Sequence, residues 1–194
     1  IILKGNHDYW WSTVSKMKNF FTEKGLTTLD FLHNNCALYG DYALCGTRGW
    51  FFEEDQKPHN AKVLNREVGR LETSLKAAEG RSIFCFLHYP PLYQGYQCPE
   101  ILSMLETYKV ELCCYGHLHG PVIRRRQEGK YGNTEFSLIT GVLKGVNCGL
   151  HLIHKGFRRL LEGTVDDHQL HGSAHGQLAI GSRRIHGIQP RLDF

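Results

Sequence analysis

The fold is decided by the stretch of residues 110–120, which reads Val110-Glu111-Leu112-Cys113-Cys114-Tyr115-Gly116-His117-Leu118-His119-Gly120. It joins an apolar run to two histidines, two positions apart, with a glycine on either side. In extended backbone, residues i and i+2 share a face. Glycine permits tight turns, so both imidazoles can converge on one point. The stretch predicts a buried strand that ends in a candidate metal site; a pair of polar turn residues is the alternative.

Two other apolar runs also end in ionisable or amide residues. Residues 1–3 and 83–87 are continuously apolar, as is typical of strands covered on both faces. The polar residues at the two ends are Asn6, His7, Asp8 and His88. Such strand ends are common places for a site in an α/β fold. The wide spacing therefore predicts one site assembled from several loops, and not a sequence-local zinc finger.

Helix and hairpin patterns fill the intervals between these strands. Apolar residues at helical spacing predict helices over residues 10–24, 61–78 and 99–108, with Ser12 as a candidate N-cap of the first. Residues 36–39 and 42–45 flank Gly40-Asp41, which predicts a β-hairpin with a two-residue turn. A last strand is predicted over residues 135–140, where apolar and polar residues alternate.

One arginine follows a predicted strand between two glycines, in Gly46-Thr47-Arg48-Gly49-Trp50. A guanidinium group held at a strand end can fork onto a phosphate with two parallel hydrogen bonds. Arg48 is therefore a candidate phosphate contact, and a solvated loop arginine is the alternative.

The composition fits one soluble domain and gives no signal for nucleic acid or membrane as a partner. The 194 residues are 41% hydrophobic and 22% charged, and 23 basic against 19 acidic side chains is a mild excess. No apolar run approaches the ~18 residues that a membrane span needs. Seven cysteines, several of them in apolar runs, indicate reduced thiols and a cytoplasmic location.

The last part of the chain differs in character from the rest. Residues 141–194 contain six of the twelve histidines and many glycines, without a sustained period. One interpretation is a histidine-rich metal-binding tail. The other is a segment that never evolved to fold here, such as an out-of-frame translation. We predict a domain over residues 1–140 and a poorly ordered tail over residues 141–194.

Taken in order, the motifs resemble the calcineurin-like metallophosphoesterase superfamily. The motifs that carry the resemblance are Gly5-Asn6-His7-Asp8, Phe86-Leu87-His88-Tyr89-Pro90-Pro91 and Tyr115-Gly116-His117-Leu118-His119-Gly120. Together with residues 46–50 they are similar to a small bacterial serine/threonine-phosphatase-like branch, over about residues 1–140. The resemblance implies an α/β fold of two packed mixed β-sheets flanked by helices. It also implies hydrolysis of phosphoesters by a hydroxide shared between two metal ions ~3.5–4 Å apart.

The resemblance further implies a role for each site residue. The implied ligands are Asn6, His88 and His117 on one metal and His119 on the other. The implied catalytic residues are His7, Asp8 and Arg48. His7 protonates the leaving oxygen, Asp8 orients His7, and Arg48 contacts the phosphate. Amide, imidazole and carboxylate donors suit Mn, Fe, Zn or Ni. The implied substrate is a phosphoprotein, a nucleotide or a small phosphoester.

The Asp-x-His and Gly-Asp strand ends of the family do not precede Ile1, which predicts an N-terminally truncated fold. An intact homologue holds two metal ions; here we expect at most one, weakly bound, and feeble or no hydrolysis. Exposed apolar edges on the first strand are a second expectation. Two other functions stay open: a degenerate, non-catalytic scaffold that binds metal or protein, and a metal buffer formed by the tail.

Overall fold

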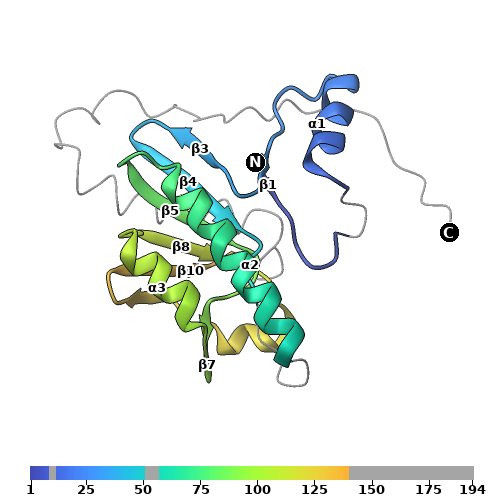
Figure 1. The fold of residues 1–194 in the computed structure, drawn as a ribbon. Helices are drawn as coiled ribbons and strands as arrows, with labels where there is room; N and C mark the ends of the chain where they lie inside the picture. Colours follow the sequence, from blue (N-terminus) through green and yellow to red (C-terminus); the bar gives the residue numbers. More distant parts are fainter. Residues whose placement is uncertain (9–11, 51–56, 140–194) are drawn as a thin grey trace, which may run out of the picture.

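The computed structural model describes residues 1–8, 12–50 and 57–139 of the chain (Figure 1). Six strands form its central mixed sheet: β3 (Cys36–Tyr39), β4 (Tyr42–Thr47), β5 (Ser82–Leu87), β8 (Leu112–Tyr115), β9 (Gly129–Tyr131) and β10 (Thr134–Leu138). They are ordered β3-β4-β5-β8-β10-β9. β3 and β4 form the predicted hairpin around the turn at residues 40–41. The predicted α/β class is confirmed.

The four central strands run parallel and end at a common register. Thr47 of β4 pairs with Leu87 of β5, which pairs with Tyr115 of β8, which in turn pairs with Leu138 of β10. The residues that follow these strands therefore leave the sheet at the same edge. This register is what brings the ends of distant apolar runs to one place.

Two helices, α2 (Lys57–Lys76) and α3 (Pro99–Thr107), cover one face of the sheet (Figure 1). Their buried leucines and Ile101 pack on the strand residues that alternate toward them. Three of those strand residues, Cys45, Cys85 and Cys113, are neighbours in the register and are fully buried. Burial raises the pKa of the Cys45 and Cys113 thiols, so they stay protonated as small apolar side chains.

The other face of the sheet carries a second, smaller apolar cluster. Phe84, Leu112 and Cys114 are buried there, and Tyr42 stacks on Phe84 with ring centroids 4.6 Å apart. The strands therefore carry apolar side chains on both faces. This explains why their sequences are continuous apolar runs without alternation.

A separate parallel pair is formed by β1 (Ile2–Leu3) and β2 (Phe31–Leu32), joined by helix α1 (Val14–Glu23). Phe21 of α1 stacks on Phe31 at a centroid distance of 4.8 Å. The N-cap is Thr13 and not Ser12: the Thr13 hydroxyl accepts the Lys16 N–H at 3.3 Å. The helix is thus shorter at its start than the apolar spacing predicted.

The remaining elements are the hairpin of β6 (Leu92–Tyr93) and β7 (Tyr96–Gln97) and the 3₁₀ helix η2 (Gly120–Arg125). No helix in the described ranges is both long and apolar enough to span a membrane. The predicted domain boundary at residue 140 and the predicted tail over residues 141–194 lie outside the described residues.

Candidate metal and active site

The site begins where β4 and β5 end, because a backbone bridge fixes the residues that follow them. The Arg48 carbonyl accepts the backbone N–H groups of His88 at 3.1 Å and of Tyr89 at 2.9 Å. The Gly116 N–H, after β8, donates to the carbonyls of Leu87 and His88, each at 3.1 Å. His88 is therefore held between the ends of two neighbouring strands, as the sequence predicted for a residue at this edge.

Asn6 approaches His88 from the separate β1–β2 pair. The Asn6 Oδ1 atom lies 2.7 Å from His88 Nε2, and the Asn6 backbone N–H donates to the same nitrogen at 3.3 Å. A Cβ atom on Gly5 would stand 3.1 Å from the His88 ring and 3.3 Å from Asp8 Oδ2. Glycine at position 5 thus lets the imidazole and the Asp8 carboxylate both approach the backbone of this loop.

His117 completes the cluster. Its ring centroid lies 5.1 Å from that of His88 and 4.7 Å from that of Tyr89. Its backbone has a φ of 66°, in the left-handed region that a non-glycine residue adopts at a cost of about 1–2 kcal/mol. Such strain is concentrated at functional sites, where the surroundings hold the residue in place.

The two central imidazoles are neutral over a wide pH range. Burial, followed by the charge of His117, lowers the pKa of His88 from 6.5 to about 4. Burial also lowers the pKa of His117, with further contributions from His119 and His7. A neutral imidazole keeps the nitrogen lone pair that a metal ion needs, so both rings are in the ligand form at neutral pH.

The other predicted site residues lie around this cluster. His7 and His119 are exposed, and their charges contribute to the lowered pKa of His117. The charge of Asp8 acts on His88 in the opposite direction and raises its pKa. Asp8 Oδ2 accepts the Gly5 backbone N–H at 2.6 Å, which fixes the carboxylate in its own loop. The structure thus brings Asn6, His88 and His117 together and leaves His119 at the rim.

The types of donor at this site suit a borderline divalent cation, and the binding of one stays a prediction. Within the described residues, no three His, Cys, Asp or Glu side chains converge closely enough to hold a metal ion. The donors that do lie together are one amide oxygen and imidazole nitrogens, and Asn6 Oδ1 and His88 Nε2 are close enough to share one partner. All three side chains are neutral donors of the type that suits Mn, Fe, Zn or Ni.

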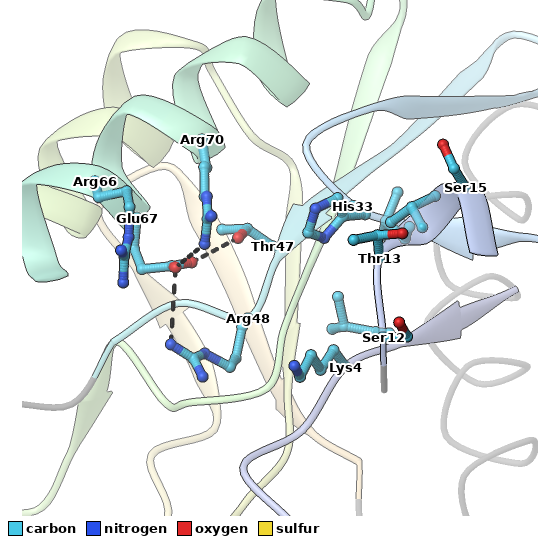
Figure 2. Close-up of a pocket in the computed structure, with 13 residues that line it drawn as sticks. Lys4, Ser12, Thr13, Ser15, His33, Thr47, Arg48, Arg66, Glu67 and Arg70 are labelled. Atoms are coloured by element: carbon cyan, nitrogen blue, oxygen red, sulfur yellow. Dashed lines mark hydrogen bonds and ion pairs between the residues drawn. The ribbon is translucent and has the colours of Figure 1, made fainter. Parts of the chain in front are cut away.

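Arg48 lines a neighbouring cavity of about 480 Å³ (Figure 2). Its Nη2 atom lies 3.8 Å from Oε1 of Glu67, and its guanidinium carbon lies 5.3 Å from the centroid of the Trp50 ring. Arg48 acts on the histidine cluster through its charge, which contributes to the lowered pKa of His88. Its phosphate contact stays a prediction.

Sequence reasoning missed the buried carboxylate of this cavity, Glu67. Its side chain is 0% exposed, and it accepts the Thr47 hydroxyl at 2.8 Å and Nη1 of Arg70 at 2.6 Å. The signal was present in the helix pattern: Glu67 lies three residues after Leu64 and four before Leu71, on the apolar side of α2. A charged residue on a buried helix face needs a partner, and Glu67 has Thr47, Arg70 and the more distant Arg48.

The chain has an α/β fold in which imidazole donors lie at the carboxyl edge of a mixed sheet and an amide donor meets them from a second, smaller sheet. Such a fold and site define a candidate metal-dependent hydrolase. The model of the calcineurin-like phosphoesterase family matches residues 1–121, which is more than half of the chain. The chain belongs to the calcineurin-like phosphoesterase family, as the motifs indicated. Comparisons with curated proteins and with solved structures gave no match. The narrower bacterial branch stays a prediction.

Proposed function

We propose that this chain hydrolyses phosphoesters in a metal-dependent reaction at the cluster of Asn6, His88 and His117. The observation that carries the proposal is the contact between Asn6 Oδ1 and His88 Nε2, which joins two strand ends from different sheets. Family membership supports the reaction class. The neutral state of both imidazoles supports the metal-binding role.

Asn6, His88 and His117 would hold the ion, and His119 would reach a second one. A bound divalent ion polarises the phosphoryl group and lowers the pKa of the attacking water. His7 would donate a proton to the leaving oxygen, and its exposure allows it to meet a substrate from solvent. Asp8, fixed by the Gly5 N–H, would orient His7, and Arg48 would contact the phosphate.

The proposal includes a limit on the activity of this chain. The three clustered donors are neutral, and neutral donors compensate the charge of a dication poorly. We therefore propose one weakly bound ion, with Mn, Fe, Zn or Ni as candidates, and feeble hydrolysis. The substrate is a phosphoester, and the free thiols of the six described cysteines support a reducing, cytoplasmic compartment.

The experiment combines manganese binding with turnover of p-nitrophenyl phosphate. Calorimetry should give a single weak site in the wild-type chain, and His88→Ala should weaken it at least tenfold because a ligand is lost. His33→Ala is the matched control: it removes a partly buried histidine outside the cluster and should leave manganese affinity unchanged.

Turnover that depends on manganese and disappears in His88→Ala supports the phosphoesterase. Manganese binding without any turnover above the EDTA baseline would favour the scaffold function. Equal manganese affinity in wild type and His88→Ala would contradict the metal site. Turnover in the usual enzyme range of about 1–10³ s⁻¹ would contradict the proposed impairment.

A further inference from the structure

The cavity beside the histidine cluster has an excess of positive charge, and of its basic side chains the proposed reaction uses only Arg48. It has a volume of about 480 Å³ and lies between α1, β1, β2, β4 and α2 (Figure 2). Its charged lining residues are Lys4, Arg48, Arg66, Arg70 and Glu67. We propose that this cavity binds a second anionic group, a phosphate or a carboxylate, of a small phosphoester substrate. The substrate class rests on the proposed function; the anion site does not.

The charges of the lining do not balance. Among the described residues that line the cavity, four side chains are basic and one is a carboxylate, which gives these residues a net charge of +3 (4 − 1). Within a partly closed space, like charges raise the local potential and concentrate anions. Arginines are suited to this purpose because their planar forks match the oxygens of phosphate and carboxylate groups.

The Glu67 carboxylate contacts donors from the wall of the cavity. Its two oxygens are directed at donors from the cavity wall: Oε2 accepts the Thr47 hydroxyl, and Oε1 is 2.6 Å from Arg70. The carboxylate is fully buried behind the guanidinium groups, whereas the side chains of Arg70 and Arg48 are 34% and 26% exposed. Glu67 therefore contacts the two arginines from their buried side, and their partly exposed guanidinium groups line the cavity.

The side of the cavity opposite the arginines is lined by residues at the start of helix α1. Thr13 and Ser15 line the cavity at the start of the ten-residue helix α1. The first turn of a helix presents N–H groups and a partial positive charge, both of which favour an anion. The cavity thus has the start of helix α1 on one side and guanidinium groups on the other (Figure 2).

The cavity adjoins the histidine cluster through Lys4 on one side and Arg48 on the other. Lys4 precedes Asn6 by two residues, so their Cα atoms lie within about 8 Å of each other. On the other side, the Arg48 carbonyl holds the His88 backbone while the Arg48 side chain lines the cavity. One small molecule can therefore place a phosphoester at the histidine cluster and a second anion among the arginines.

The size of the cavity selects among the substrate classes of the proposed function. A volume of about 480 Å³ lies within the usual range of small-molecule sites, about 300–1,000 Å³. A folded phosphoprotein would present its phosphate on a surface too broad to enter it. The cavity therefore favours a small phosphoester that carries a second anionic group, such as a phosphorylated carboxylic acid or a bisphosphate.

The test measures anion binding to the full chain in EDTA, so that no metal ion contributes. The probe is inorganic pyrophosphate, and its binding is measured by calorimetry at low and at high salt. Arg66 is exposed, and Arg66→Gln should weaken pyrophosphate binding about threefold to tenfold because one charge-assisted contact is lost. Arg66→Lys should restore part of the affinity. Lys62→Gln is the matched control, because Lys62 is also exposed on α2 and lies outside the cavity lining.

An equal effect of Arg66→Gln and Lys62→Gln would overturn the anion site, as would absence of pyrophosphate binding at low salt. A second measurement tests the substrate class: with manganese, 3-phosphoglycerate should have a lower KM than glycerol 3-phosphate, and Arg66→Gln should remove the difference. Equal KM values in the wild type would overturn the assignment to substrates with a second anionic group. Pyrophosphate binding without any manganese-dependent hydrolysis would refute the proposed phosphoesterase activity and would still support the anion site.

Discussion

Glu67→Gln is expected to destabilise the fold while it tightens anion binding. The substitution keeps the volume and one acceptor oxygen of a side chain that is 0% exposed, and it removes the negative charge. The 2.6 Å contact with Arg70 is a charge-assisted bond, a class that contributes about 1.5–3 kcal/mol when buried. Because Arg70 is 34% exposed and can turn to water, we discount this to about 1–2 kcal/mol.

The Thr47 hydroxyl adds a smaller contribution to the same variant. Thr47 is 3% exposed, and exchange of a carboxylate for an amide acceptor weakens its hydrogen bond by about 0.5–1 kcal/mol. The total loss in unfolding free energy is about 2 kcal/mol. This corresponds to about 4–8 °C in Tm for a chain of this size.

The assay is urea unfolding followed by far-ultraviolet circular dichroism, together with pyrophosphate calorimetry in EDTA. Glu72→Gln is the control: it removes a partly exposed α2 carboxylate that pairs with Lys76 at 2.8 Å, and stability should stay within error. The reasoning is refuted if Glu67→Gln and Glu72→Gln unfold at the same urea concentration. It is refuted equally if Glu67→Gln weakens pyrophosphate binding, because the net charge of the cavity rises in that variant.

Three further predictions concern the sheet, helix α2 and the histidine cluster. Gly46→Ala should lower the free energy of unfolding by about 3 kcal/mol or more, because a Cβ there would overlap the Phe86 carbonyl oxygen. Gly69→Ala, where a Cβ would meet nothing within 4 Å, should raise it by about 0.5–1 kcal/mol. Thermal unfolding of both variants tests this. Leu71→Ala, at 0% exposure, should cost about 2–5 kcal/mol in urea unfolding, and a loss below 1 kcal/mol would contradict its place in the core. Burial lowers the pKa of His88 from 6.5 to about 4, so between these values the unfolded chain binds a proton that the folded chain does not. Stability of the metal-free protein should therefore be full above about pH 6.5 and fall toward pH 4. His88→Gln should flatten that slope, and an unchanged slope would count against the pKa shift.

The elements that were predicted correctly are those whose pattern is local. The hairpin of β3 and β4 follows from two apolar runs around a two-residue turn, and β5 and β8 follow from continuous apolar runs that end at polar residues. The start of α1 was placed too early, because Ser12 and Thr13 are both good caps and only the backbone distinguishes them.

The sequence by itself determined which residues stand at the strand ends, and therefore that Asn6, His88, His117 and His119 are candidates for one site. Strand ends are set by where an apolar run stops, which is a property of neighbouring residues. Only the tertiary structure decided that Asn6 Oδ1 meets His88 Nε2, because the two come from different sheets. It alone decided that Glu67 and Arg70 form one wall of a basic cavity, because helix α2 must first pack against β4 before those charges can meet Thr47.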